Sequence, residues 1–177
     1  MLRTVECEAA VFGCRAVEAH PTEKGGLPDP SCLIAAPGAD HLFGRIPRER
    51  WGVIADLDPV EVTQQFEAAD LALPGVILRA SGTIEHDYVS AAEQLGADPN
   101  FCLAVEDSPE GIDAALKIGM KVIAVAGGAD PVGLSAADMV IPSLLSLHVV
   151  GLHPVLVLEV DALPEFGTFN PGQIKRR

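Results

Sequence analysis

The sequence predicts an α/β protein built on a doubly wound parallel sheet with helices on both faces. Two observations lead to this prediction. Short apolar runs alternate with helical segments between residues 51 and 126, and acidic or hydroxyl residues stand where apolar runs give way to helices. Strand–helix–strand units at this spacing form right-handed crossovers, which place consecutive strands parallel in one sheet. A chain of 177 residues is long enough for one such domain.

The expected strands are short runs of mainly apolar residues bounded by polar or turn residues. They cover 8–14, 51–56, 75–80, 101–105 and 121–126, and a further buried strand is expected at 156–158.

Three helices are expected between these strands. Asp58 and Ser108 each stand directly before a proline and are placed to cap the first and third helices. The second helix covers about 87–95. Gly96 and Gly119 are placed to end the second and third helices, because glycine adopts the left-handed conformation that often follows a helix.

The rest of the chain has weaker periodicity. Residues 18–50 are rich in proline and glycine and are expected to form loop, with one short helix near 38–44. We expect a core domain over 1–147, followed by a C-terminal strand and an extended tail over 148–177.

Composition excludes several classes of partner. A formal charge of −13 argues against binding nucleic acid or an anionic membrane through bulk electrostatics. The uncharged run 139–158 is interrupted by prolines, histidines and serines, so no membrane span is expected. The cysteines show no zinc spacing, and no signal peptide precedes them: Cys7, Cys14, Cys32 and Cys102. We therefore expect inert thiols in the cytoplasm or another reducing compartment, and not a secreted protein.

The stretch "CLAVEDSPEGIDAALKIGM", residues 102–120, places two acids at the junction of a strand and a helix. Ligands of open parallel sheets bind at the carboxyl ends of the strands, and paired carboxylates suit Mg²⁺. Alternatively, Glu106 and Asp107 only complement the dipole of the helix that follows.

The run "AAEQLGADPNFCLAVEDSPEGIDAALKIGMKVIAVAGG" resembles the last third of haloacid dehalogenase-like phosphatases, in particular the sugar-phosphatase and β-phosphoglucomutase branch. The resemblance continues through 135–147 and, more weakly, upstream. It implies a Rossmann-like doubly wound core, in which Glu106, Asp107, Ser108 and Gly111 correspond to the final acidic motif.

The other motifs of that family are degenerate in this chain. The family's nucleophile lies in a stretch resembling "FDxDGTL", and the aligned "FGCRAV" places Gly13 at the nucleophile position and Arg15 at the acid–base position. Ala55 ends the strand that in the family ends in a phosphate-binding Thr or Ser. Aligned through Tyr88, Gly82 or a neighbour takes the place of the family's lysine. Glycine offers no nucleophile, and a guanidinium stays protonated near neutral pH.

The family's helical cap is also expected to be absent or vestigial. Residues 18–36 replace it and hold too many prolines in too short a span for a helical bundle, so a loop is expected. Cys14 is not expected to substitute as the nucleophile, because strand alternation turns it to the opposite face. We predict instead that the guanidinium of Arg15 pairs with Glu106 or Asp107 and takes the place of the lost cation; alternatively, Arg15 points to solvent.

These observations favour a catalytically inactive pseudophosphatase that serves as a structural or protein-interaction module, as one subunit of a larger assembly for example. No cofactor is expected in that case, and the partner is a protein. The alternative is a diverged phosphatase acting on sugar phosphates, in which Glu106 and Asp107 hold Mg²⁺. A third hypothesis is a sensor that binds a small phosphorylated ligand without turnover.

Overall fold

The strands and helices that the sequence predicts are all present and occur in the expected order, together with further elements that it does not predict. The computed structural model describes residues 1–17, 35–127 and 131–163, with the backbone alone for Cys14 and Arg15. The strands in this part of the chain are β1 (Leu2–Cys7), β2 (Ala9–Gly13), β3 (Trp51–Ala55), β4 (Val76–Arg79), β5 (Cys102–Glu106), β6 (Lys121–Val125), β7 (Met139–Ile141), β8 (Leu147–Gly151) and β9 (Leu156–Asp161). The α-helices are α1 (Cys14–Val17), α2 (Ala39–Phe43), α3 (Pro59–Ala68), α4 (Ile84–Gln94) and α5 (Pro109–Lys117). Single 3-10 turns cover Arg48–Arg50, Pro99–Phe101, Pro131–Leu134 and Leu144–Ser146.

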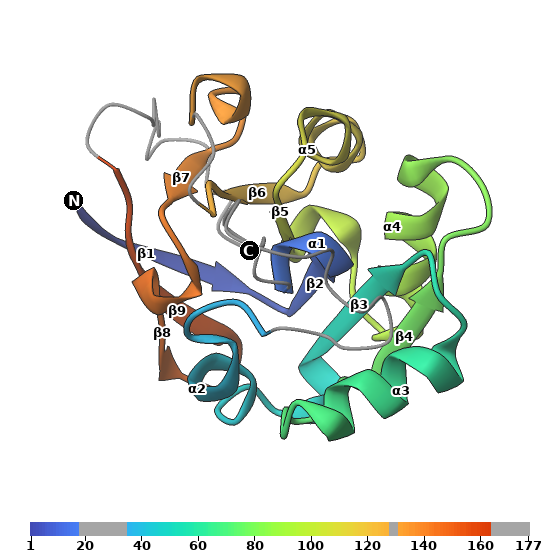
Figure 1. The fold of residues 1–177 in the computed structure, drawn as a ribbon. Coiled ribbons are helices and arrows are strands. Elements are labelled where there is room, and N and C mark those ends of the chain that lie inside the picture. The colour runs from blue at the N-terminus through green and yellow to red at the C-terminus, as the bar shows by residue number, and fades with distance from the viewer. Residues whose placement is uncertain (18–34, 128–130, 164–177) are drawn as a thin grey trace, which may run out of the picture.

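The described strands form two sheets (Figure 1). Six parallel strands lie in the order β4-β3-β2-β5-β6-β7, which confirms the predicted doubly wound α/β core. Three antiparallel strands form a second sheet in the order β1-β9-β8. Because β2 lies between β3 and β5, the carboxyl ends of these three strands lie side by side.

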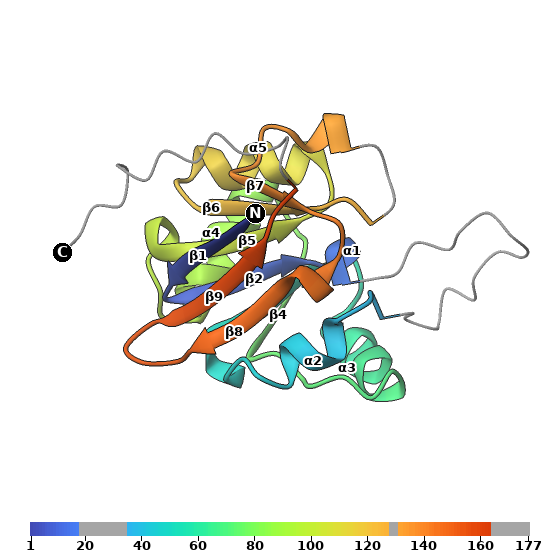
Figure 2. The same ribbon diagram turned by 90° about the vertical axis from the view of Figure 1, so that its left-hand side faces the viewer.

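The two faces of the parallel sheet are covered differently. Along β2, Val11 packs in the cluster with α4 and α5, whereas Phe12 packs in the opposite cluster with α2 and α3. The antiparallel sheet covers part of the second face, where Leu158 joins the same cluster as Phe12. Figure 2 shows β1, β9 and β8 in front of the parallel strands. Part of the face that the sequence assigns to helices is thus covered by a small sheet.

Aromatic side chains fill the second face. Phe43 stacks on Trp51 with ring centroids 4.1 Å apart, and Phe12 meets both rings edge-on. Phe66 of α3 lies at the border of the same group. These rings fix α2 and α3 against the strands whose ends form the candidate site.

The four residues predicted to cap or end helices are confirmed in these roles. Asp58 and Ser108 are the N-caps of α3 and α5, and Asp58 forms the expected capping box. Gly96 and Gly119 follow α4 and α5 with φ of 70° and 87°. The predicted start of the second helix was three residues late, because Thr83 caps α4 by accepting a hydrogen bond from the His86 N–H.

The first strand of the core ends one residue earlier than predicted. β2 stops at Gly13, and Cys14 opens α1, so strand alternation does not decide where Cys14 points. The side chains of Cys14 and Arg15 lie outside the described part of the structure. The predicted loop at 18–36 also lies outside it, except for its last two residues. The Val17 carbonyl, directly before that segment, accepts a hydrogen bond at 2.7 Å from the N–H of Ala36, its last residue.

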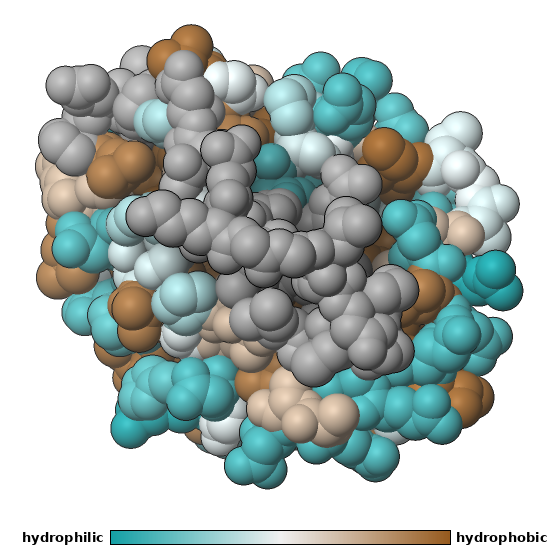
Figure 3. Space-filling model, in the orientation of Figure 1, coloured by the Kyte–Doolittle hydropathy of each residue, from teal (hydrophilic) through white to brown (hydrophobic). Residues whose placement is uncertain are grey.

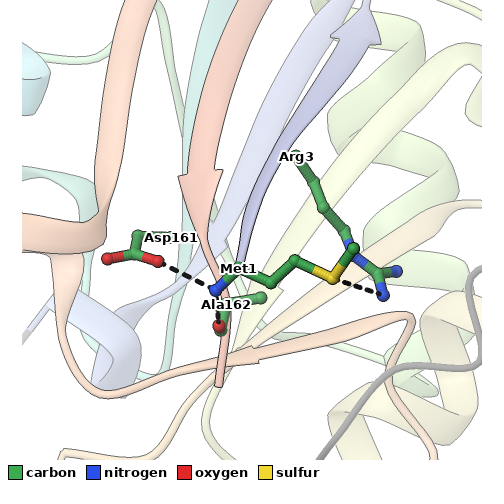
Figure 4. Close-up of polar contacts among 4 residues, drawn as sticks. All are labelled: Met1, Arg3, Asp161 and Ala162. Carbon is green, nitrogen blue, oxygen red and sulfur yellow. Dashed lines mark hydrogen bonds and ion pairs between the residues drawn. The ribbon is translucent and has the colours of Figure 1, made fainter. Parts of the chain in front are cut away.

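The antiparallel sheet was predicted only in part. The strand expected at 156–158 is confirmed as the longer β9, whereas β1 and β8 were not predicted. β1 pairs with β9 from Leu2 opposite Asp161 to Cys7 opposite Leu156. At the open end of this pair the Met1 amine donates to Asp161 and to the Ala162 carbonyl, at 3.1 and 2.7 Å (Figure 4). The division of the chain at residue 147 stays a prediction.

The described surface mixes polar and apolar side chains. On the face shown in Figure 3, hydrophobic residues are more frequent over β1, β8 and β9 than over α3. Large apolar side chains exposed in that sheet are Leu2 and Val150, and Met1 is exposed directly before β1. Within 1–17, 35–127 and 131–163, no helix has the length and hydropathy needed to cross a membrane.

Candidate functional site

The candidate site lies at the carboxyl ends of β2 and β5. Gly13 is the last residue of β2, and Glu106 is the last residue of the neighbouring β5. Side chains alternate along a strand, and both positions fall on the face that carries α4 and α5. The two residues therefore face each other across adjacent strand ends.

Glu106 points inward instead of toward solvent. Only 7% of its surface is exposed. The Tyr88 hydroxyl of α4 donates a short hydrogen bond to Glu106 Oε1. Oε2 accepts from the Asp107 N–H at 3.2 Å and from the Ser108 hydroxyl at 3.3 Å. Both carboxyl oxygens are therefore hydrogen-bonded within the protein, as buried polar atoms need to be.

Two glycines enclose this carboxyl. A Cβ at Gly13 would lie 2.6 Å from Glu106 Oε1 and 3.0 Å from its carboxyl carbon. A Cβ at Gly111 of α5 would lie 2.3 Å from the same carboxyl carbon. Neither glycine has the positive φ that favours glycine on conformational grounds. With Glu106 in its present orientation, a Cβ at either position would overlap its carboxyl, so the carboxyl would have to move.

Burial shifts the pKa values of Glu106 and Tyr88. Removal from water raises the pKa of Glu106, and the hydrogen bonds from Tyr88 and the Asp107 N–H oppose this effect. Burial, followed by the nearby Glu106 charge, raises the pKa of the Tyr88 hydroxyl well above its usual value. Tyr88 therefore remains a neutral hydrogen-bond donor at physiological pH.

The remaining predicted residues fall in different places. Ser108 caps α5, and its hydroxyl links the Gly111 N–H to Glu106. Asp107 is half-buried, and Ala55 is buried at the end of β3. Gly82 is exposed, and a Cβ there would meet only His86. The structure thus brings Gly13, Glu106, Ser108 and Gly111 together.

Other acids, histidines and cysteines of the chain have structural roles or lie on the surface in the described residues. Asp58 accepts a hydrogen bond from the Val60 N–H as a helix cap, and Asp56 is exposed. His41, His86, His148 and His153 are exposed, and His20 lies outside the described residues. Burial raises the pKa of the Cys7 and Cys102 thiols to about 12, so both remain protonated.

Comparison with known proteins identifies the family. No family model matches the sequence. Hexitol phosphatase A of Escherichia coli (strain K12) is 32% identical over 124 residues, which are 66% of this chain and 57% of that protein. The chain belongs to the haloacid dehalogenase-like superfamily. A haloacid dehalogenase-like hydrolase domain-containing protein of Arabidopsis thaliana is also 32% identical, over 62% of this chain and 35% of that protein. The chain therefore spans little more than half of the first relative and about a third of the second.

A solved structure supports the same fold. The chain superposes on a haloacid dehalogenase-like hydrolase, family IA, variant 3, from Entamoeba histolytica HM-1:IMSS with a TM-score of 0.59. The two are 14% identical, and the superposition covers 80% of this chain and 95% of the other. Identity this low supports the haloacid dehalogenase-like fold and carries no information on activity.

Mg²⁺, which the superfamily resemblance implies, does not fit the described side chains. A magnesium site needs several converging oxygen ligands. Gly13 supplies none, and both oxygens of Glu106 already accept hydrogen bonds from the protein. Among the residues that the structure describes, no group of three or more His, Cys, Asp or Glu could hold a metal ion.

Tyr88 is the site residue that sequence reasoning missed. In the sequence it serves only as the residue through which the family's lysine position is aligned. A usable signal was present, because a buried tyrosine usually finds a partner for its hydroxyl, and Tyr88 shares its buried face with Ala91 and Ala92. The partner, Glu106, lies 18 residues away and could not be identified from local periodicity.

The predicted pairing of Arg15 with the acids stays a prediction, and it has a direct test. Changing Arg15 to alanine is expected to lower the free energy of unfolding by about 1 kcal/mol, because a partly exposed ion pair is lost. Added Mg²⁺ should then raise the melting temperature of the variant but not of the wild type, since the acids have lost their fixed cation. Thermal unfolding with and without Mg²⁺ measures both effects. Arg45→Ala, at an exposed position after α2, is the matched control, and an equal Mg²⁺ response in all three proteins would refute the pairing.

Proposed function

We propose that this haloacid dehalogenase-like protein is catalytically inactive and serves as a structural or protein-interaction module. The observation that carries the proposal is the position of the Glu106 carboxyl, which occupies the space beside Gly13. In the family, the nucleophilic aspartate stands at the position of Gly13, and its side chain would enter this space. A Cβ there would lie 2.6 Å from Glu106 Oε1, closer than non-bonded atoms approach.

The other groups needed for phosphoryl transfer are also absent from the matching positions. Transfer depends on a nucleophile and on donors or cations that stabilise charge on the phosphoryl oxygens. Ala55 has no hydroxyl, and Gly82 has no cationic side chain. These features support a fold that is retained for a purpose other than hydrolysis.

A protein partner suits the chemistry of the chain better than nucleic acid or a bound cofactor. The formal charge of −13 opposes contact with phosphate backbones. No cofactor is required for the role that we propose. Met1 and Leu2 at the start of β1 and Val150 of β8 are exposed apolar side chains that a protein partner can cover.

Purified protein is expected to show no Mg²⁺-dependent hydrolysis above a buffer blank on p-nitrophenyl phosphate or a panel of sugar phosphates. The reason is that Gly13, Ala55 and Gly82 replace the family's nucleophile, its phosphate-binding hydroxyl and its lysine. Phosphate release measures turnover, and hexitol phosphatase A assayed in parallel shows that the panel and the assay work. Turnover that is lost in Asp107→Asn, with unchanged melting temperature, would overturn the proposal.

The second candidate function is a diverged Mg²⁺-dependent phosphatase acting on sugar phosphates. Its support is the 32% identity to hexitol phosphatase A together with the retained Glu106 and Asp107. The same assay distinguishes the two functions. In the absence of turnover, co-purification of the tagged chain from its native extract tests the interaction role. A stoichiometric protein partner is expected, whereas a chain recovered alone or with a small phosphorylated ligand would contradict that role.

A further inference from the structure

Four elements meet at the carboxyl of Glu106. Gly13 ends β2, Glu106 ends β5, Tyr88 belongs to α4, and Gly111 belongs to α5. Gly13, Tyr88 and Gly111 all contact or closely approach the carboxyl group of the fourth residue, Glu106. The group therefore stands where two adjacent strands of the sheet meet both helices of one face.

The position of the Glu106 carboxyl leaves no space for a side chain at Gly13 or Gly111. Atoms that are not bonded do not approach within 3.0 Å of a Cβ, yet a Cβ at Gly13 or Gly111 would lie 2.6 or 2.3 Å from the nearest Glu106 atom. These atoms belong to a carboxyl that cannot retreat freely, because Tyr88, Asp107 and Ser108 all donate to it. A side chain at position 13 and the present orientation of Glu106 thus exclude each other.

Hydrogen bonding makes Glu106 and Tyr88 depend on each other. Tyr88 is 1% exposed, so its hydroxyl has no ready access to water if the carboxyl is removed. Glu106 in turn would lose the donor of Oε1 if the hydroxyl were removed. A buried polar group that loses its partner retains its full desolvation cost.

We infer that Gly13, Tyr88, Glu106 and Gly111 form one interdependent structural unit, the glutamate lock, in which the Glu106 carboxyl takes the space of a side chain at position 13. The lock ties β2 and β5 to α4 and α5 at the carboxyl edge of the sheet. Glu106, which the family resemblance assigns to the final acidic motif, is in this chain part of the packed interior. This packing is independent of whether the chain hydrolyses a phosphate ester.

A double-mutant cycle tests the lock. Gly13→Ala is expected to lower the melting temperature by about 4–10 °C, because the new methyl group overlaps the carboxyl. Glu106→Ala is expected to lower it by a similar amount, because Tyr88 loses its acceptor. In the Glu106→Ala background the space beside position 13 is open, so adding Gly13→Ala should change the melting temperature by less than about 2 °C.

The matched control is Gly52→Ala in β3, where an added Cβ would meet Val76 and not Glu106. Its effect should be the same, within about 2 °C, in the wild type and in Glu106→Ala. If Glu106→Ala does not fold, Glu106→Asp completes the cycle, because it withdraws the carboxyl by one methylene. Additive effects of the changes at 13 and 106 would overturn the lock, as would a Gly13→Ala protein with the stability of the wild type.

Discussion

Gly13→Asp, which restores the acid found at the family's nucleophile position, is expected to destabilise the protein by about 3–5 kcal/mol at pH 7. The new side chain must displace the Glu106 carboxyl, since its Cβ would lie 2.6 Å from Oε1. It also brings a second carboxylate to a site where Glu106 is only 7% exposed. Two neighbouring carboxylates repel each other, and partial burial strengthens the repulsion. Urea unfolding followed by circular dichroism gives the free energy of unfolding.

Gly13→Asn separates charge from size. It is nearly isosteric with the aspartate variant, so it should share the packing cost without the repulsion. The difference between the two variants should shrink as the pH falls toward 4, because protonation of either acid removes the repulsion. It should also shrink with added Mg²⁺, because the introduced aspartate would join Glu106 and Asp107 as a cation ligand. Equal stability of the two variants at pH 7 would show that charge at position 13 is of no consequence.

The fold could be predicted wherever its signals are local. Asp58 and Ser108 predict the starts of α3 and α5. The first N–H groups of a helix need acceptors, and the side chain that caps them is close by in the sequence. The parallel strands are recognisable because they are apolar on both faces. Thr83 was overlooked as the cap of α4, although its hydroxyl acts in the same way.

The antiparallel sheet could not be predicted from local pattern. β1 is only partly apolar, and its buried Val5 and Cys7 alternate with polar residues. Its partner, β9, lies at the other end of the core, and the Met1–Asp161 contact spans 160 residues. Alternation of this kind indicates a strand, but it does not indicate which distant segment pairs with it.

The candidate site was predicted in identity but not in arrangement. The resemblance selected Gly13 and Glu106 as positions of interest, and the structure places them against each other. Sequence patterns say that a residue ends a strand, but the direction of its side chain depends on what fills the space around it. The enclosure of Glu106 by Gly13, Gly111 and Tyr88 involves four separate elements and becomes visible only once they are folded together.

Tyr88→Phe is expected to destabilise the protein by about 2–3 kcal/mol at pH 7, because Glu106 loses the donor of Oε1 in a buried site. The cost should depend on pH. Burial raises the folded-state pKa of Glu106 above its unfolded value, so its contribution to stability is greatest below the unfolded pKa and is lost as the pH rises through the folded pKa. The Tyr88 hydrogen bond limits this shift, and removing it should raise the folded-state pKa further. The stability difference between wild type and variant should therefore be small near pH 4 and should grow toward pH 7.

Glu106→Gln provides the control for this pH dependence. A glutamine has nearly the same shape and carries no proton that titrates in this range, so Tyr88→Phe should cost the same at pH 4 and pH 7 in that background. Urea unfolding of the four proteins across this range gives each free energy of unfolding. A pH-dependent cost that persists with glutamine at position 106 would assign the titration to another acid. A pH-independent cost in the wild-type background would show that the hydroxyl of Tyr88 does not support the charged form of Glu106. Either result would show that the stability contribution of Tyr88 in α4 does not depend on the charge of Glu106 in β5.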